Sequence, residues 1–536
     1  MRVMVLLAAL LTVSTASAQN ARNANQAPDV VFYNAKVITV DSTFSIQQAF
    51  AVRGDTYVAV GSNATVRALA GKNTRLVDLR GAAVIPGLSD SHDHLFNSER
   101  YMRGIDLAGA RSTSEVLRRL RDGMAQFKPG ETVFGGLGWR APLTRTDLDG
   151  LSETVPIVAL SGRRGEAVMN TAALAKAGVG PGTKDFLGSA MPRDANGGLT
   201  GTMPSGRGLD LIDRVVPVPT PSEEEQLILH GQQQRLALGI TSIRELSSSP
   251  AGVRAFERVR DDGKLQMRVA FGLEVSDRDG PQAFLRNQVV NSGFGDKWLR
   301  FSALGETVPT TAEFSREMNH FGWRPAPHLT ENDALDRALD AWESADHDQS
   351  IKGKRWFVEH VPNVTPKDIK RIAALGLIVS TNMAGYPNDY DAAIKTLGQE
   401  QADRQTPVRE LLDAGLIVLS GSDYNGPNPP TAATNNNPWI HVYYYTTRKN
   451  KDGRVVGPQE KITRQEALRI VTVNNAYATF EEGVKGPIEI GKLADFVVLS
   501  ADYLTVSDED ILKLRPIATY VGGIKVYGAA AASGGY

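Results

Sequence analysis

The sequence has 536 residues, with 59 Lys and Arg against 60 Asp and Glu, eight histidines and no cysteine. At roughly 150 residues per domain, this length allows two to four domains or one large barrel with additions. A formal net charge of −1 provides no basic surface for DNA, RNA or an anionic membrane, so we expect none of these as a partner. Without cysteine there are no disulfides and no thiolate ligands, so any metal must be held by His, Asp, Glu or a modified Lys.

The first 18 residues have the pattern of a secretory signal peptide. Met1-Arg2 is a basic start, Val3–Leu11 is a short apolar stretch, and Ala16-Ser17-Ala18 is a small-residue cleavage motif. The apolar stretch is too short to span a bilayer comfortably. We therefore expect cleavage after Ala18 and a mature protein that is soluble and either periplasmic or secreted.

Strand-like runs at the two ends of the chain predict a small β-sandwich that is built from both termini. These runs are rich in β-branched residues and are separated by polar turns. They are Val30–Val40, Phe50–Gly61, Ala494–Leu499 and Ile517–Val526. Because neither end is long enough to bury a core alone, we expect residues 28–82 and 487–530 to form one composite domain.

Between these ends, strand-like runs alternate with helical patterns such as Glu331–Ser344, Pro366–Leu375 and Pro407–Ala414. The strand-like runs are Val84–His94, Ile240–Leu246, Val269–Val275, Leu299–Glu306, Pro325–Leu329, Trp356–His360, Leu377–Thr381 and Leu416–Asp423. Eight parallel strands that alternate with helices predict an α/β fold, a (β/α)8 TIM barrel over residues 83–486. The segment from about 97 to 220 is far too long for a strand-to-helix loop, so we expect an inserted subdomain there.

Four of the eight histidines fall at the ends of predicted strands. His92 and His94 are two residues apart, so in a strand both imidazoles point to one face, which at this end of a barrel is the mouth. His328 lies near the end of the fifth run, His360 closes the sixth, and Asp423 closes the eighth. Four imidazoles and a carboxylate at one mouth predict a site for a divalent metal such as zinc.

Two segments resemble the opening and closing signatures of the amidohydrolase superfamily. Residues 85–94 (IPGLSDSHDH) are similar to its P-G-h-h-D-x-H-x-H opening, and residues 486–499 (GPIEIGKLADFVVL) resemble its G-x-I-x-x-G-K-x-A-D-h-V-h-h closing signature. Matches at Gly135–Trp139, Ala338–Glu343 and Glu359-His360 favour the amidohydrolase-3, YtcJ-like group. The resemblance implies a (β/α)8 barrel, a terminal β-sandwich and metal-dependent hydrolysis of a C–N bond.

The fourth predicted strand departs from this family pattern. YtcJ-like members often carry a Lys there whose carboxylated form can bridge two metals, but Arg300 takes that position and its guanidinium stays protonated. Glu306, at the mouth end of the same strand, can supply an equivalent bridging carboxylate. The alternative is a single-metal site without a ligand from this strand.

Two further departures lie in the predicted insertion. Residues 162–170 lack a His that many relatives carry, and Arg140 stands where an acidic residue is common. Because the insertion shapes the pocket, we do not carry over a relative's substrate specificity. Among the other histidines, we interpret His230, His320 and His347 as surface or helix residues, and His441 as a pocket candidate.

We therefore predict a metal site with the ligands His92, His94, Glu306, His328, His360 and Asp423 and with one or two zinc-like ions. Such ions supply Lewis acidity, which lowers the pKa of water from about 15.7 towards 7 and polarises a scissile carbonyl. Asp423 is the predicted general acid and base, which takes the proton of the attacking water and passes it to the leaving nitrogen. His360 or His328 could instead polarise the carbonyl directly.

We therefore expect a hydrolase that acts on C–N bonds other than peptide bonds in a small-molecule substrate. The same residues would also serve a deaminase or a hydrolase of esters, lactones or carbamates, and a non-catalytic, exported metal-binding protein is a further alternative. We find no G-x-S-x-G elbow, P-loop or dinucleotide fingerprint, so we expect neither a serine nucleophile nor a nucleotide cofactor. The sequence leaves open the substrate, the number of metals and the oligomeric state, and an oligomer is compatible with it.

Overall fold

The computed structural model describes residues 26–96, 103–136, 139–160, 167–203, 208–275, 290–306, 308–330, 332–360, 363–382, 390–424 and 436–528. The expected leader at residues 1–18 lies outside these ranges, as does most of the departure at residues 162–170. Within them, no helix combines the length and the apolar character needed to cross a membrane.

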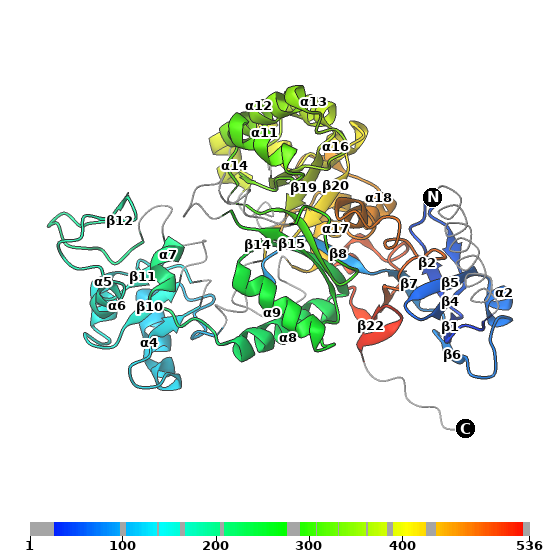
Figure 1. The fold of residues 1–536 in the computed structure, drawn as a ribbon, viewed down its shortest axis with the longest axis horizontal. Helices are drawn as coiled ribbons and strands as arrows, with labels where there is room; N and C mark the ends of the chain where they lie inside the picture. Colours follow the sequence, from blue (N-terminus) through cyan, green and yellow to red (C-terminus); the bar gives the residue numbers. More distant parts are fainter. Residues whose placement is uncertain are drawn as a thin grey trace, which may run out of the picture.

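Eight parallel strands form two four-stranded sheets at the centre of the molecule (Figure 1). The strand orders are β16-β15-β14-β8 and β17-β18-β19-β20. The strands are β8 (Leu88–Asp93), β14 (Ile240–Ser248), β15 (Arg268–Leu273), β16 (Leu299–Leu304), β17 (His328–Leu329), β18 (Phe357–His360), β19 (Ile378–Asn382) and β20 (Val418–Gly421). Each of the eight predicted runs overlaps one of them.

Single parallel bridges connect the outer edges of the two sheets. Asp93 of β8 bridges Tyr424, which follows β20, and Leu304 of β16 bridges Pro325, which precedes β17. The eight strands therefore follow one another in a cyclic order, and the fold is mixed α/β and TIM-barrel-like.

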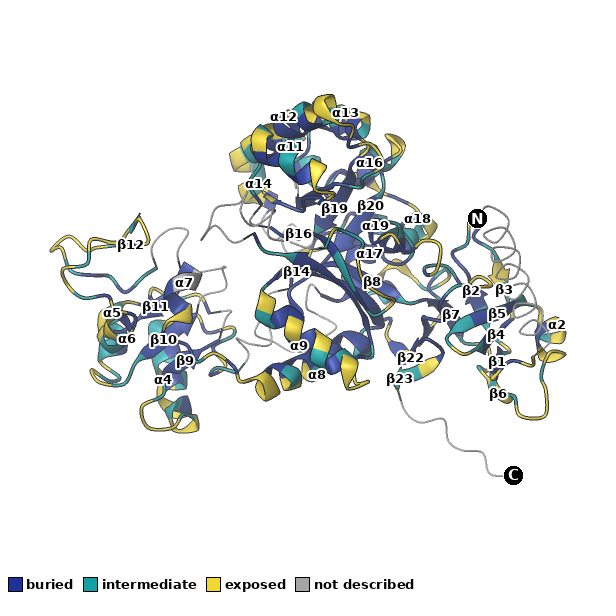
Figure 2. Ribbon diagram, viewed as in Figure 1, coloured by how far each residue is buried: buried dark blue, intermediate teal, exposed yellow. Residues whose placement is uncertain are grey.

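Helices cover the outside of these strands. They are α8 (Pro221–Ala237), α9 (Pro250–Asp261), α11 (Ala312–His320), α12 (Asn332–Asp348), α13 (Pro366–Leu375), α14 (Tyr390–Leu397), α15 (Gln399–Asp403), α16 (Val408–Asp413), α17 (Pro438–Thr447), α18 (Arg464–Ile470), α19 (Asn474–Ala478) and α20 (Asp508–Ile511). Local sequence sets their ends: in α13, Thr365 and Asp368 form a capping box, and Gly376 ends the helix in the left-handed conformation, with φ 67°. Most residues of the central strands are buried, whereas α8, α9 and α12 have exposed outer faces (Figure 2).

Two further sheets share a core beside these central strands. One sheet has the order β5-β4-β1-β6, and the other has the order β23-β22-β21-β7-β2-β3. Their strands are β1 (Val30–Tyr33), β2 (Lys36–Ile38), β3 (Ile46–Gln47), β4 (Ala49–Arg53), β5 (Thr56–Gly61), β6 (Arg75–Asp78), β7 (Ala83–Pro86), β21 (Phe496–Leu499), β22 (Pro516–Val521) and β23 (Ile524–Tyr527), with α2 (Asn63–Arg67) after β5. Phe32 and Phe50 of the first sheet pack against Phe496 and Tyr520 of the second, with ring centroids 4.8 to 5.3 Å apart. Both chain ends therefore contribute to one core.

The predicted first barrel strand, Val84–His94, is two strands in the structure. β7 pairs with β2 and β21 in the terminal sheet, and only β8 joins the central strands. The chain changes sheets at Gly87, where a Cβ atom would lie 2.0 Å from Oγ1 of Thr241, so this close approach requires glycine. The change from the terminal sheet to the central strands therefore lies at Gly87, whereas the domain boundary at residue 83 stays a prediction.

The segment between β8 and α8 packs around hydrophobic clusters of its own. Its elements are α4 (Thr113–Gly123), β9 (Val133–Gly135), α5 (Arg145–Asp149), β10 (Ile157–Leu160), β11 (Ala167–Met169), α6 (Thr171–Lys176), β12 (Asp185–Phe186), β13 (Ser189–Ala190) and α7 (Gly208–Asp213). Strands β11, β10 and β9 form its main sheet. Figure 1 shows this unit, the central strands and the terminal sheets in a row along the long axis of the molecule.

Asp495 of the closing signature joins the terminal sheet to the central strands. Its two carboxylate oxygens accept hydrogen bonds from Nε and Nη2 of Arg268, the first residue of β15, at 2.5 and 2.7 Å. The backbone N–H of Gly522 donates to the same carboxylate at 2.8 Å. The side chains of Arg268 and Asp495 are only 2% and 8% exposed, so this is a buried ion pair.

We expect the substitution Asp495→Ala to lower the free energy of unfolding by about 3–5 kcal/mol, because the Arg268 guanidinium stays buried without its acid. Urea unfolding of the purified variant measures this loss. Arg337→Ala is the control, because its pair with Asp333 lies on the surface and should contribute little. Equal losses in the two variants would contradict a special role for the buried pair.

Candidate metal centre

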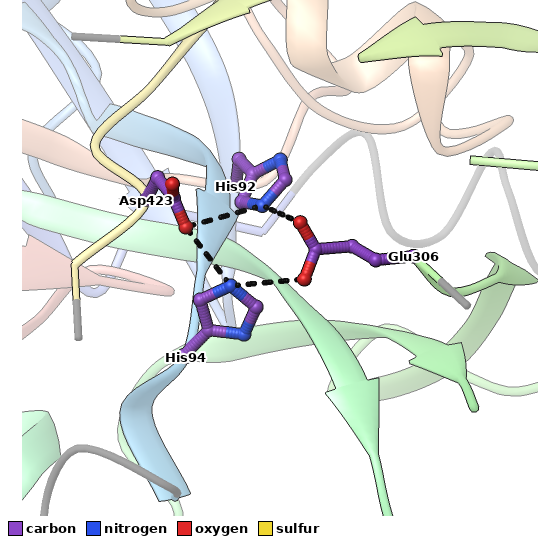
Figure 3. Close-up of side chains that lie close together, drawn as sticks. All are labelled: His92, His94, Glu306 and Asp423. Atoms are coloured by element: carbon purple, nitrogen blue, oxygen red, sulfur yellow. Dashed lines mark hydrogen bonds and ion pairs between the residues drawn. The ribbon is translucent and has the colours of Figure 1, made fainter. Parts of the chain in front are cut away.

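Four side chains from three strand ends face one another at the carboxyl ends of the central strands (Figure 3). His92 and His94 come from the end of β8, Glu306 follows β16, and Asp423 follows β20. Nε2 of His92 lies 3.1 Å from Oε1 of Glu306, and Nε2 of His94 lies 3.4 Å from Oε2 of the same carboxylate. Oδ1 of Asp423 lies 3.1 Å from Nε2 of His94 and 3.5 Å from Nε2 of His92.

Glu306 also belongs to a second group, with His328 of β17 and His360 of β18. Its Oε1 lies 3.0 Å from Nδ1 of His328 and 3.0 Å from Nε2 of His360. In each of the two groups the potential ligand atoms all lie within 4.8 Å of one another. The structure thus brings together all six side chains that the sequence singled out, with Glu306 common to both groups. Their roles as ligands or catalysts stay predictions.

The backbone at two strand ends turns the side chains into this site. His360 has φ 67° and Asp423 has φ 49°, both in the left-handed region that residues other than glycine rarely adopt. Such a conformation costs about 1–3 kcal/mol and is typical of functional sites. The backbone N–H of Asp423 donates to the carbonyl oxygen of His92 at 2.7 Å, which fixes the end of β20 against β8.

Gly421 allows this close approach of β20 to β8. A Cβ atom at this position would lie 2.3 Å from Cβ of His92 and 2.7 Å from its backbone nitrogen. Neither atom can move without shifting β8, so a side chain at residue 421 would displace His92 from Asp423.

The charges in this site stabilise one another. Burial alone would lower the pKa of His92, but the Glu306 carboxylate raises it well above its ordinary value. Burial alone would raise the pKa of Glu306, but His92, His94 and their neighbours lower it far below its usual range. The pKa of Asp423 is lowered as well, since burial, which raises it, is outweighed by His94 and His92. Both carboxylates are therefore held ionised among imidazoles.

The residues present fit a divalent metal. Nε2 of His92 is buried and makes no hydrogen bond to any described residue, although it lies near the Glu306 and Asp423 oxygens. A buried polar atom without a hydrogen bond is rare unless something else binds it. Imidazoles mixed with carboxylates suit zinc better than magnesium or calcium, which prefer oxygen ligands alone.

Two charged residues behind His92 were not predicted. Oε2 of Glu359 lies 3.0 Å from Nδ1 of His92, and Oε1 of Glu359 accepts a hydrogen bond from Nη2 of Arg244 at 2.9 Å. Burial alone would raise the pKa of Glu359, but Arg244 and His92 lower it to about 2. A charged residue inside an otherwise apolar strand run was the available signal, because a buried charge needs a partner.

Other residues that the sequence singled out lie away from these two groups. Arg300 is near the start of β16, at the end remote from Glu306, and its Nη1 donates to the carbonyl oxygen of Gly293 at 3.0 Å. His441 lies buried on α17, with Nδ1 2.7 Å from Oγ of Ser420, and belongs to neither metal-ligand group.

The three remaining histidines lie on helices, as predicted. They are His230 on α8, His320 on α11 and His347 on α12. His320 pairs with Asp348 at 2.7 Å on the surface.

We expect Gly421→Ala to destabilise the protein by about 1–3 kcal/mol and to reduce the amount of bound metal, because the new methyl group overlaps His92. Thermal unfolding and metal analysis of the purified variant measure the two effects. Gly483→Ala is the matched control, since a Cβ atom there meets nothing within 4 Å. Normal metal content in Gly421→Ala would show that the approach of β20 to β8 does not set the site.

Comparison with known proteins places the chain in a family. The sequence model of the amidohydrolase family matches residues 75–527. An N-substituted formamide deformylase of Arthrobacter pascens is 25% identical over 551 residues, which cover 94% of this chain and 99% of the relative. The putative amidohydrolase YtcJ of Bacillus subtilis (strain 168) is 24% identical over 496 residues, covering 85% of this chain and 90% of that protein.

A similar fold occurs in a solved structure. The crystal structure of an uncharacterized metal-dependent hydrolase from Pyrococcus horikoshii OT3 has a TM-score of 0.71 at 20% identity, covering 90% of this chain and 99% of the other. This likeness concerns the fold alone, whereas the family match spans most of the sequence, including both predicted signatures. The chain belongs to the amidohydrolase family.

Proposed function

We propose that this protein is a metal-dependent amidohydrolase that hydrolyses an amide-like C–N bond of a small molecule. The observation that carries the proposal is the position of Glu306, whose carboxylate is shared by two groups of imidazoles. A carboxylate in this position suits a bridge between two divalent ions, and the mixed His and carboxylate donors favour zinc. Family membership and the relative named as a formamide deformylase support a C–N bond as the target.

We also infer a closed (β/α)8 barrel and a terminal β-sandwich built from both chain ends. The cyclic strand order and the two bridges between the central sheets support the barrel. The aromatic core shared by the two terminal sheets supports the sandwich. In a barrel of this kind the carboxyl ends of the strands form the active-site mouth, which is where the six side chains lie. Export with cleavage after Ala18 stays a separate prediction.

The six side chains differ in their exposed fraction, and this difference suggests their roles. The Glu306 side chain is 2% exposed, which suits a ligand, whereas the Asp423 side chain is 16% exposed and can reach a substrate. The imidazole of His328 is 47% exposed, so this ring lies closest to the solvent side of the site. We assign His328 and His360 to the second metal group with Glu306; in the alternative assignment, one of these two rings polarises the scissile carbonyl directly.

When bound, a divalent metal supplies Lewis acidity, which polarises a carbonyl and makes water a stronger nucleophile. Asp423, which is ionised at neutral pH, accepts the proton of the attacking water at its carboxylate. The same carboxylic acid then donates this proton to the leaving nitrogen, which departs as a neutral amine. A general acid and base of this kind contributes roughly 10²–10⁴-fold to the rate.

We expect about two equivalents of metal in the purified protein and about one in Glu306→Ala, because the shared Glu306 carboxylate would be a ligand of both ions. Elemental analysis after zinc loading and removal of excess metal gives the stoichiometry. Glu313→Ala, an exposed position on α11, is the control and should keep the wild-type value. A wild-type protein that binds no metal would refute the proposed function, and an unchanged value in Glu306→Ala would refute the bridge.

We expect Asp423→Asn to retain metal but to lose turnover by about 10²–10⁴-fold, since the amide keeps an oxygen near His94 but cannot carry the proton. The assay follows released amine, ammonia and acid across a panel of formamides, amides, amino-heterocycles, carbamates and esters. Release of amine with acid supports the proposed reaction. Ammonia from a heterocycle would indicate a deaminase instead, acid without amine would indicate an ester hydrolase, and near-normal turnover in Asp423→Asn would remove the assigned role.

A further inference from the structure

A chain of three buried charged or polar side chains leads away from the metal centre. Glu359 lies between His92 and Arg244, with one carboxylate oxygen directed to each. All three side chains are 0% exposed. They come from three different strands, β8, β14 and β18, so the contact exists only in the folded centre.

The Arg244 guanidinium is held on several sides. Nη1 donates to the carbonyl oxygen of Ser91 at 2.9 Å, and Nε donates to Oγ of Ser302 at 3.3 Å. Its Cζ lies 3.7 Å from the ring centroid of Phe357, which packs against the face of the guanidinium. These contacts leave Nη2 in a fixed place, so Arg244, together with a hydrogen bond from the Ser380 side chain, positions the Glu359 carboxylate.

We propose that Arg244 and Glu359 are positioning residues that make His92 a metal ligand, an inference that rests on the proposed metal site. A neutral imidazole has one N–H and one lone pair. The carboxylate at Nδ1 accepts the N–H of His92, and this leaves the lone pair on Nε2, the nitrogen that lies near Glu306 and Asp423. A carboxylate behind a histidine ligand also makes the imidazole a stronger donor.

His94 provides a comparison within the same strand. Its Nδ1 lies 3.0 Å from the backbone carbonyl oxygen of Leu246, which is neutral and cannot be replaced by mutation. Both histidines therefore direct Nε2 into the site. The acceptor at Nδ1 is a charged side chain for His92 and a backbone carbonyl for His94. Substitutions at residues 244 and 359 should accordingly affect the ligand from His92 and leave His94 in place.

The isosteric substitution Glu359→Gln tests this arrangement sharply. Glu359 offers one acceptor oxygen to His92 and the other to Arg244. A glutamine has one acceptor oxygen and one NH2 group, so one of the two partners must face a donor. Either His92 changes its tautomer or Arg244 loses its carboxylate partner. Both changes should weaken metal binding by Nε2 of His92.

The experiment measures Zn²⁺ affinity by competition with a chromophoric chelator, on the purified full-length protein. We expect Glu359→Gln and Arg244→Met each to weaken Zn²⁺ binding by about 10–100-fold. Arg324→Met is the matched control: Arg324 is buried against the same Phe357 ring at 4.6 Å and donates to Ser302, but its guanidinium makes no hydrogen bond to the Glu359 carboxylate. It should lose thermal stability but keep wild-type Zn²⁺ affinity.

A spectroscopic measurement separates positioning from general packing. In the Co²⁺-substituted protein we expect the visible absorption bands to change in Glu359→Gln and to match wild type in Arg324→Met. Wild-type affinity and wild-type bands in Glu359→Gln would overturn the inference, as would equal weakening in Arg324→Met and Arg244→Met. If wild type itself binds no Zn²⁺, the proposed function fails and this inference with it, whereas normal wild-type binding with unaffected variants refutes the positioning role alone.

Discussion

The placement of one buried carboxylate, that of Glu306, governs the centre of this protein. An ionised carboxylate without a partner costs several kcal/mol or more when it is removed from water, so it requires positive or metal-binding groups around it. Four imidazoles supply these groups, from three strand ends besides its own. The cyclic order of the strands brings these rings to one carboxylate, and the left-handed backbone at His360 turns its ring into the site. Gly421 lets β20 approach β8, which places Asp423 beside His92.

Three other buried carboxylates are each matched by an arginine. Asp93, which points away from the metal site, is held by two hydrogen bonds from Arg235 at 2.8 and 2.9 Å. Glu359 is matched by Arg244, and Asp495 by Arg268. Each of these arginines lies on a different segment of the chain from its acid, so the ion pairs join separate elements and do not stabilise single helices or strands. Buried pairs of this kind favour one arrangement of the elements over others, because any shift leaves two charges unmatched.

The strands and the six side chains can be located from the sequence, but the charged residues that hold those side chains in place cannot. The strand runs are visible because buried parallel strands are apolar and bounded by turns, and Glu306 was found because it ends such a run. The switch between β7 and β8 was missed, since Val84–His94 reads as one strand and only the neighbours of each half reveal two sheets. Arg244 and Glu359 are harder to predict. A charged residue in a buried strand indicates that it has a partner, but the sequence does not identify the strand on which that partner lies.

The position of β7 within its sheet has a consequence for how the chain folds. β7 pairs with β2 on one side and with β21 on the other, and β21 begins at residue 496. Strands β2, β3 and β7 therefore cannot complete their sheet until β21 has been synthesised. Until then one edge of β7 is unpaired, and its pairing with β21 joins segments more than 400 residues apart. Folding rates fall as contacts become this distant in sequence, so we expect this pairing to be slow.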